Sequence, residues 1–367
     1  MAGLAGLAFE KGHKVTGQDK AYYPPMSDQL DQLGIKQNKT EEITEDLKKC
    51  DAVIISNSQS RGIKSVEYVL NNNLKYFSGP EWIKKYILND KFVFVISGTH
   101  GKTTTTSMLI KILQESKLNP SYLLGGVYLE EKISYKFTNA KYFIIEGDEY
   151  DTSFFDKRSK FVHYKPNTLV INNLEYDHSD IFENIIQIQK QFHFLIRSMP
   201  GNSNIIYDDS DENVKKIILM GCWSKKNIYK KIDKIENIIG DHNLKNCGAA
   251  IATAEKFCSS RENYTKALEK FLGVKRRLER IKSKNFILYD DFAHHPTAIA
   301  ASIKALKEKH KKGKINAFFE ISSNSMIEGT HKDNFLHSFS DADNIFIYCK
   351  KDVAWLKAIP SIDLYKD

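Results

Sequence analysis

Runs of apolar residues alternate along the chain with stretches in which apolar residues return every three or four positions. The runs at 92–96, 142–145 and 168–171 are short and continuous, as in strands buried on both faces of a parallel sheet. Residues 108–113 and 297–309 carry the helical spacing instead. This alternation of buried strands and amphipathic helices predicts an α/β protein with parallel sheets.

The same pattern divides the chain into three parts. Before residue 86, short strands at 15–17 and 51–56 alternate with short helices in a small parallel α/β unit. The central part contains the three buried strands and two later helices at 243–257 and 263–272. A new strand at 286–289 opens the last part. We therefore expect three domains, over residues 1–85, 86–272 and 273–367.

Composition narrows the class of protein. The 367 residues are 41% hydrophobic and 27% charged, which is ordinary for a globular α/β protein. The net charge of +8 is spread over many lysines without a basic, aromatic-rich block, so we expect no nucleic-acid partner. No signal peptide or membrane span is recognisable, and the five scattered cysteines indicate reduced thiols. These features predict a soluble, cytoplasmic protein.

A glycine-containing segment, Gly98-Thr99-His100-Gly101-Lys102-Thr103-Thr104, joins the strand at 92–96 to the following helix. Glycines let backbone N–H groups approach phosphate oxygens, and a helix N-terminus adds partial positive charge. The Lys102 amine can bridge terminal phosphates, and the Thr103 hydroxyl can reach a bound Mg²⁺ ion. A simple turn is the alternative, but strand, loop and helix together favour a nucleotide site. Its candidate residues are Gly98, Thr99, Gly101, Lys102, Thr103 and Thr104.

Polar residues also follow the next two buried strands. Glu146 begins an acidic cluster after the strand at 142–145, and Asn173 and His178 follow the strand at 168–171. Carboxyl ends of parallel strands meet at one edge of a sheet, so we expect these side chains beside the glycine loop. Carboxylates there would repel a triphosphate unless Mg²⁺ lay between them. A solvated acidic turn and a structural histidine are the alternatives.

Two later segments place histidine beside acidic or amide side chains at the start of a predicted helix. They are Gly240-Asp241-His242-Asn243 and Asp290-Asp291-Phe292-Ala293-His294-His295-Pro296. Asp and Asn accept hydrogen bonds from first-turn N–H groups, and proline suits a first helical position. Both segments are therefore open to two interpretations, helix capping and ligand binding.

Taken together, these motifs resemble the Mur ligase family of peptidoglycan synthesis, in order and spacing, over nearly the whole chain. The strings that carry the resemblance are Gly98 to Thr103, Glu146 to Glu149, Asn173 to His178, His242-Asn243, Arg276-Arg277 and Asp290 to Pro296. Strings at 15–19, 23–27, 78–82, 150–164 and 220–223 are similar to the branch of the family that serves peptidoglycan recycling. The resemblance implies three α/β domains with parallel sheets, the central one a P-loop ATPase domain.

For function, the resemblance implies an ATP- and Mg²⁺-dependent amide ligase. It would join the tripeptide L-Ala-γ-D-Glu-meso-diaminopimelate to the lactyl carboxylate of UDP-N-acetylmuramate through an acyl phosphate. Lys102, His178 and His294 would act in catalysis, and Thr103, Glu146 and His178 would serve Mg²⁺. The other implied site residues are Asn243 at the adenine, Arg277 at the phosphates, Asp291 at the ribose, and Asp19, Ser56, Asn57, Ser58 and Asn173 at the substrate.

The sequence also departs from the family pattern. It opens in a helix, without the strand and glycine-rich turn that normally precede it, and its third domain ends well before the family's usual finish. In addition, Ser322 and Ile327 stand where relatives typically carry Arg and Lys. We therefore expect the first and third domains to be incomplete. The alternatives are the sister ligase that adds free L-alanine, a remnant that binds nucleotide without catalysis, and a generic ATPase or folate-type polyglutamate ligase.

Overall fold

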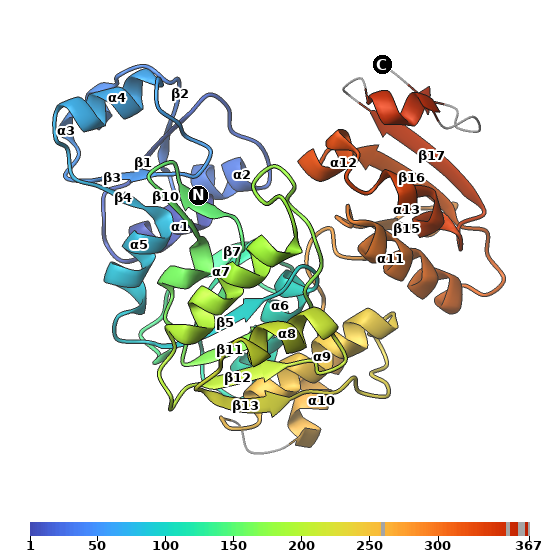
Figure 1. Cartoon of the computed structure of the whole chain (residues 1–367). Coiled ribbons are helices and arrows are strands. Elements are labelled where there is room, and N and C mark those ends of the chain that lie inside the picture. The colour runs from blue at the N-terminus through green and yellow to red at the C-terminus, as the bar shows by residue number, and fades with distance from the viewer. Residues whose placement is uncertain (258–260, 350–352, 359–363, 366–367) are drawn as a thin grey trace.

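The computed structural model describes residues 1–257, 261–349, 353–358 and 364–365. Its helices and strands form three α/β bodies in chain order, coloured blue, cyan to gold, and orange to red in Figure 1. Four of the five cysteines are free thiols, and Cys258 lies outside the described residues. In the described part of the chain, no helix is long and apolar enough to cross a membrane.

The N-terminal body contains two separate pairs of parallel strands. Strand β1 (Thr16–Asp19) pairs with β2 (Lys36–Lys39), and β3 (Val53–Ile55) pairs with β4 (Tyr76–Ser78). The predicted parallel α/β unit is present, but its short strands form two sheets rather than one. Its helices are α1 (Ala2–Glu10), α2 (Met26–Gln32), α3 (Glu45–Lys49), α4 (Lys64–Asn71), α5 (Gly79–Ile83) and η1 (Lys84–Leu88).

The central body is built on a seven-stranded sheet in the order β13-β12-β11-β5-β8-β6-β7. All neighbouring strands run parallel except β7, which is antiparallel to β6. The strands are β5 (Phe92–Ser97), β6 (Ser121–Tyr128), β7 (Ile133–Lys136), β8 (Tyr142–Gly147), β11 (Thr168–Ile171), β12 (Asn204–Tyr207) and β13 (Lys225–Ile228). Between β8 and β11 lie the antiparallel pair β9 (Asp151–Ser153) and β10 (Asp156–Ser159) and the turn η2 (Lys160–His163).

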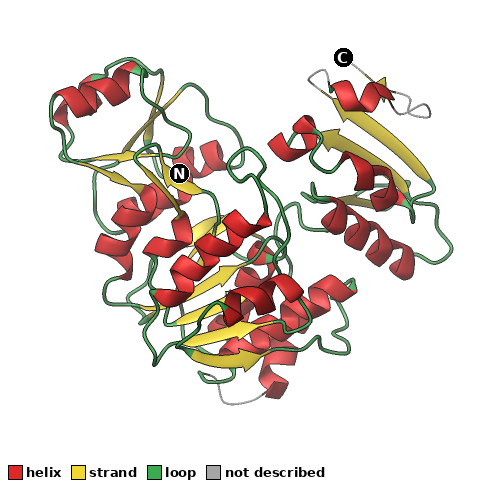
Figure 2. Ribbon diagram, viewed as in Figure 1, coloured by secondary structure: helices red, strands yellow, loops and turns green. Residues whose placement is uncertain are grey.

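Alternate residues of β5 enter two hydrophobic cores, one on each face of this sheet. Val93 and Val95 belong to the core that contains α7 (Ile185–Arg197) and α8 (Glu212–Leu219). Phe94 and Ile96 belong to the other core, with the helices α6 (Lys102–Glu115), α9 (Asp241–Ala254) and α10 (Arg261–Glu269). Helices thus cover both faces of the sheet (Figure 2). Each fully buried Val, Ile or Phe stabilises this arrangement by roughly 1.5–3 kcal/mol.

Helix α1 packs closely on the central body through glycine. A Cβ atom added to Gly6 would overlap the ring of Tyr135, and one added to Gly3 would lie 2.6 Å from Leu123 Cδ1. The Gln29 carboxamide of α2 reinforces this contact by accepting hydrogen bonds from the backbone N–H and the hydroxyl of Ser134. The N-terminal body is therefore held against the β6–β7 edge of the large sheet.

The C-terminal body combines an antiparallel pair, β14 and β15, with a parallel sheet in the order β16-β17-β18. The expected strand at 286–289 is shorter and shifted, because Phe286 and Ile287 are exposed and pairing begins at Leu288. Its elements are β14 (Glu279–Ile281), β15 (Leu288–Asp290), α11 (Pro296–Lys309), β16 (Asn316–Ile321), α12 (Asn324–Glu328), α13 (Lys332–Phe335), η3 (Leu336–Phe339), β17 (Asn344–Cys349), η4 (Ala354–Ala358) and β18 (Leu364–Tyr365).

Candidate active site

The glycine loop between β5 and α6 is shaped by two left-handed backbone positions. Gly98 has φ +126° and Gly101 has φ +79°, values that side-chain-bearing residues rarely adopt. A Cβ on Gly98 would lie 2.9 Å from the Asn173 carbonyl oxygen, and one on Gly101 would clash with the Asn246 side chain. Helix α6 begins directly afterwards at Lys102, so its unpaired N–H groups point towards the loop. This cradle fits the phosphates of a nucleotide.

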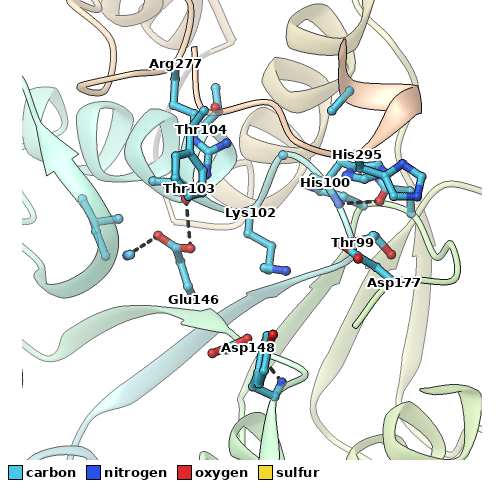
Figure 3. Close-up of a pocket in the computed structure, with 18 of the residues that line it drawn as sticks. Thr99, His100, Lys102, Thr103, Thr104, Glu146, Asp148, Asp177, Arg277 and His295 are labelled. Atoms are coloured by element: carbon cyan, nitrogen blue, oxygen red, sulfur yellow. Dashed lines mark hydrogen bonds between the residues drawn. The ribbon is translucent and has the colours of Figure 1, made fainter. Parts of the chain in front are cut away.

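A cavity of about 950 Å³ opens over this loop and takes its walls from all three bodies. In Figure 3, Lys102 lies at the centre, with Thr103 and Glu146 to its left and His100 and His295 to its right. Fourteen of the predicted site residues line it: Ser56, Asn57, Thr99, Gly101, Lys102, Thr103, Thr104, Glu146, Asn173, His178, Asn243, Arg277, Asp291 and His294. The segments that sequence reasoning assigned to one crevice do meet.

Three predicted residues do not line the cavity. Asp19 ends β1 at an exposed position, and Ser58 is exposed with its hydroxyl 2.7 Å from that of Ser56. Gly98 belongs to the loop itself, and its carbonyl oxygen accepts a hydrogen bond from Lys102 Nζ at 2.8 Å. The structure thus gives Gly98 a role in holding the lysine, while substrate binding by Asp19 and Ser58 stays a prediction.

Lys102 is held by a buried carboxylate that sequence reasoning left unassigned. Its Nζ lies 2.9 and 2.8 Å from the two carboxylate oxygens of Glu149, whose side chain is 3% exposed. Burial alone would lower the pKa of Lys102, but Glu149 and Asp148 outweigh burial and raise it. The lysine is therefore a fixed cation at the start of α6.

Glu146 and Thr103 form the hard-oxygen pair that Mg²⁺ prefers. Thr103 Oγ1 donates to Glu146 Oε2 at 3.0 Å, and the Gly125 N–H donates to Glu146 Oε1 at 2.6 Å. Burial raises the pKa of Glu146, and the Gly125 N–H and the Arg277 guanidinium oppose that rise. A hydroxyl and a carboxylate at the mouth of a phosphate cradle fit a Mg²⁺ ion that is shared with phosphate oxygens and water.

His178 contacts Glu149 in this structure, and its predicted role at Mg²⁺ stays a prediction. Its Nε2 lies 3.2 Å from Glu149 Oε1, and no hydrogen bond or ion pair of these described side chains joins it to Thr103 or Glu146. Burial alone would lower the pKa of His178, but the hydrogen bond and charge of Glu149 raise it. Its φ of +59° lies in the left-handed region, which non-glycine residues adopt uncommonly. Glu149 therefore joins the lysine and the histidine in one buried cluster.

Three more predicted residues, Arg277, Asp291 and His294, line the cavity from the C-terminal body, and Asn243 lines it from α9 of the central body. Arg277 Nη2 lies 3.5 Å from Thr103 Oγ1, and its guanidinium stacks over Phe292 at 5.2 Å. Asp291 accepts a hydrogen bond from the Ser302 hydroxyl at 2.6 Å, and His294 Nε2 lies 4.0 Å from Asp177 Oδ2. Asn243 donates to the Ile239 carbonyl oxygen at 2.9 Å. A neighbouring residue therefore orients the polar group of each of these four side chains at the cavity.

Direct hydrogen bonds hold the C-terminal body on the loop that follows β11. The Ser325 hydroxyl donates to Asp177 Oδ1 at 3.0 Å, and Asn324 donates to Asp180 Oδ2 at 2.9 Å. Nearby, Ile327 packs partly against the C-terminal core, whereas Ser322 is exposed. Hydrogen bonds between side chains of α12 and side chains of the central body thus hold this helix beside the cavity.

One further cluster escaped sequence reasoning. His100, Glu175 and His295 each place a possible metal-ligating atom within 4.8 Å of the others, the one such set of three found in the described part of the chain. His100 and Glu175 were visible only as members of longer motifs, and His295 comes from the other body. The three side chains come together only because the two bodies dock, and the spacing of residues within a motif does not predict that docking.

Comparison with protein families matches three consecutive segments. Residues 1–91 match the catalytic domain of the Mur ligase family, residues 96–233 the Mur ligase middle domain, and residues 276–357 the Mur ligase glutamate ligase domain. The second segment contains the glycine loop, Glu146 and His178, and the third begins at Arg276. The matched domains therefore meet at the cavity described above.

Curated relatives and solved structures agree with these matches. UDP-N-acetylmuramate:L-alanyl-γ-D-glutamyl-meso-2,6-diaminoheptandioate ligase from Haemophilus influenzae is 41% identical over 97% of this chain and 84% of its own length. The ligase of the same name from Escherichia coli is 40% identical over the same shares. A murein peptide ligase from Psychrobacter arcticus superposes with a TM-score of 0.79 at 33% identity, covering 100% of this chain and 88% of its own. With its three matching domains and these relatives, the chain belongs to the Mur ligase family.

Proposed function

We propose that the chain joins the free amine of L-alanyl-γ-D-glutamyl-meso-diaminopimelate to the lactyl carboxylate of UDP-N-acetylmuramate, with ATP as the energy source and Mg²⁺ as the cofactor. The identity of 40–41% to ligases of that name over 97% of the chain supports the substrate assignment. The observation that carries the chemistry is the cavity in which Lys102, Thr103 and Glu146 meet residues of the other two domains. Both nucleotide substrates belong to the cytoplasm, which is the compartment we propose.

The chemistry requires activation of an unreactive acid. A carboxylate resists attack by an amine until one of its oxygens becomes a good leaving group. In the proposed reaction the lactyl oxygen bonds to the terminal phosphorus of ATP as the bond to ADP breaks, giving an acyl phosphate. The peptide amine then attacks the acyl carbon, and inorganic phosphate leaves with the electron pair of the broken C–O bond. Each step develops negative charge that the site must stabilise.

The residues of the chain divide this task among them. The Lys102 ammonium and the N–H groups at the start of α6 would bind the terminal phosphates. Thr103 and Glu146 would hold Mg²⁺, which, when bound, neutralises charge on the phosphate oxygens. Glu149 and the Gly98 carbonyl orient the lysine, with contacts of 2.8–2.9 Å. Arg277, at 3.5 Å from Thr103 Oγ1, would add a second cation from the far side.

The position of the cavity suits a reaction that water must not enter. Acyl phosphates hydrolyse readily, so the intermediate must be enclosed between its formation and its capture. The C-terminal domain contributes Arg277, Asp291 and His294 to the same cavity as the glycine loop. We infer that docking of this domain closes the site over the substrates, with His294 near the incoming peptide.

A reconstituted reaction tests the proposal. The purified chain is incubated with ATP, Mg²⁺ and UDP-N-acetylmuramate, together with either the tripeptide or L-alanine, and the product is identified by mass. We expect the tripeptide adduct and one phosphate released per bond formed. An L-alanine adduct alone would assign the chain to the sister activity, and nucleotide binding without either product would identify it as a non-catalytic remnant.

A further inference from the structure

A second group of ligating side chains lies where the central and C-terminal domains meet. His100 comes from the loop after β5, Glu175 follows β11, and His295 is the N-cap residue of α11. One possible ligand atom of each lies within 4.8 Å of the others. Figure 3 shows His100 and His295 side by side. None of the three has a role in the function proposed above.

The separations of these atoms approach those of a tetrahedral metal site. Glu175 Oε2 lies 3.5 Å from His100 Nε2 and 3.5 Å from His295 Nδ1. With metal–ligand bonds of about 2.0–2.1 Å, neighbouring ligands of tetrahedral zinc lie about 3.3 Å apart. Each of these two separations therefore needs to change by only a few tenths of an ångström, and the two imidazole ligand atoms lie within 4.8 Å of each other. The two imidazole rings are also close, with centroids 4.7 Å apart.

Neighbouring groups already orient the three side chains. The Thr297 hydroxyl donates to Glu175 Oε2 at 2.7 Å, and the Glu175 N–H donates to Thr99 Oγ1 at 2.8 Å. The His100 N–H donates to the Asn173 side-chain oxygen at 2.8 Å. Such outer hydrogen bonds fix ligand geometry in metal sites. The ion would displace only the long 3.3 Å hydrogen bond from the Thr297 N–H to His295 Nδ1.

The ligand atoms are also in a suitable chemical state. His100 Nε2 is buried and makes no hydrogen bond to any residue that the structure describes. Burial, and then the neighbouring His100 and His331, lower the pKa of His295 to about 4, so its imidazole is neutral at pH 7. Burial alone would raise the pKa of Glu175, but His100, Thr297 and His295 lower it to about 2. An ionised carboxylate and an unprotonated imidazole nitrogen both have lone pairs available, so together they can bind a cation.

We propose that His100, Glu175 and His295 bind one divalent ion of the zinc class, with water in the fourth position. Two imidazoles and one carboxylate favour Zn²⁺ over Mg²⁺, which prefers an all-oxygen shell. The site is therefore distinct from the Thr103–Glu146 pair. Because His295 belongs to the C-terminal domain and the other ligands to the central one, the bound ion fastens the two domains together.

An entry path for the ion lies beside the cluster. A second cavity of about 430 Å³ is lined by Glu175, His295, His331 and His337. The His331 ring centroid is 4.4 Å from that of His295, and within the described residues the buried His331 Nε2 has no hydrogen-bond partner. An ion arriving from solvent would thus meet further imidazole on its way to the three ligands.

Cobalt titration tests the proposal on the full chain. Co²⁺ replaces Zn²⁺ in tetrahedral sites and gives visible absorption bands that closed-shell Zn²⁺ lacks. After treatment with a chelator, the chain should bind one equivalent of Co²⁺ with tetrahedral bands, and Zn²⁺ should abolish them. His100→Gln, Glu175→Gln and His295→Gln should each raise the dissociation constant for Co²⁺ by at least about tenfold.

Two control variants separate this site from others. Glu146→Gln should keep the tetrahedral bands, because Glu146 belongs to the Mg²⁺ pair. His310→Gln should keep them too, because His310 contacts Tyr289 at the far end of α11. The proposal is wrong if Glu146→Gln removes the bands while His295→Gln keeps them, or if the wild-type chain shows no tetrahedral band.

Thermal unfolding gives a second readout that does not depend on ligase activity. Zn²⁺ should raise the unfolding midpoint of the wild-type chain by several degrees, because it binds only where the two domains meet. The midpoint of His295→Gln should not respond to Zn²⁺, and its circular dichroism should match that of the folded wild-type chain. Equal Zn²⁺ shifts in both proteins would overturn the proposal, whatever the outcome of the ligase assay.

Discussion

Among single residues, Glu149 determines how the cations of the site are held. Its buried carboxylate pairs with Lys102 at 2.8 Å and with His178 at 3.2 Å. Lys102→Ala should lower turnover by at least about 100-fold, because the charge that develops on phosphate loses its fixed cation. It should also lower the free energy of unfolding by about 3 kcal/mol, because a buried carboxylate loses one partner. Phosphate release and urea denaturation measure the two effects.

Two companion variants separate the catalytic effect from the structural one. The double variant Lys102→Ala with Glu149→Gln should regain much of the unfolding free energy but none of the turnover. Lys111→Ala is the matched control, since Lys111 lies on the same helix and pairs with Glu115 at 2.9 Å rather than with Glu149. Unchanged turnover in Lys102→Ala would remove this lysine from the mechanism.

His295 should make the fold sensitive to mild acid. Its pKa is lowered from 6.5 to about 4, so the unfolded chain takes up a proton before the folded chain does. The free energy of unfolding should therefore fall as the pH drops from 6.5 towards 4. Chelator-treated wild-type protein and His295→Gln are compared by urea midpoints across this range. The variant should lose less stability, and equal losses would contradict the assignment.

The residues around the cavity were partly predictable from the sequence, but their partners were not. Lys102 and Glu146 belong to short motifs, and the residue types and spacing within each motif were enough to predict a role in binding phosphate or Mg²⁺. The Lys102–Glu149 pair spans 47 positions and forms because β5 and β8 are neighbours in the sheet. A sequence pattern shows that a carboxylate follows a strand, but strand order decides which cation it meets.

Among helices and strands, continuous burial made prediction straightforward and exposure made it fail. Strands β5, β8 and β11 lie inside the large sheet, so their apolar runs are unbroken. Edge strand β13 reads Lys-Lys-Asn-Ile and is largely exposed, so no hydrophobic signal marks it. In the N-terminal body, the predicted strands at 15–17 and 51–56 overlap β1 and β3, whereas the polar strand β2 (Lys-Gln-Asn-Lys) and the three-residue strand β4 carried no such signal.

The turn before α6 offers a test of the phosphate cradle. Gly101→Ala should weaken nucleotide binding, because the added Cβ would clash with Asn246 and deform the loop. It should also lower the free energy of unfolding by more than the roughly 1–2 kcal/mol of a left-handed alanine. Gly34→Ala is the control, since Gly34 has φ +65° and open space around its Cβ position. Calorimetric titration with ADP and urea denaturation compare the two variants.

For the molecule as a whole, the site is complete only when the C-terminal domain is docked. Arg277 crosses to Thr103 at 3.5 Å, whereas its neighbour Arg276 pairs with Asp290 outside the cavity lining. Arg277→Ala should lower kcat/KM for ATP by about tenfold or more, and Arg276→Ala should change it little. Steady-state kinetics on both variants measure this, and equal effects would place the role of Arg277 in folding rather than in the site.

The three-domain architecture could be predicted from motifs that occur in a fixed order, but the docking of the domains could not. Contacts such as Ser325 with Asp177 and Thr297 with Glu175 span 148 and 122 positions and join side chains of different domains. The local sequence around each of these residues indicates only the start of a helix or the end of a strand. The contacts between them form only when both domains are folded and docked, so the local sequence could not predict them.

Because Lys102 and His178 share the Glu149 carboxylate, nucleotide binding should be coupled to the uptake or release of protons. When the Lys102 amine moves from Glu149 to the bound phosphates, Glu149 pairs with His178 alone. The positive charge of Lys102 then no longer lowers the pKa of His178, which should rise. Binding near neutral pH should then take up a fraction of a proton, so its calorimetric heat should vary with the ionisation enthalpy of the buffer. If His178 instead coordinates Mg²⁺, the ion requires a neutral imidazole and the same titration should release protons. The sign of the buffer dependence thus tells which partner the histidine keeps.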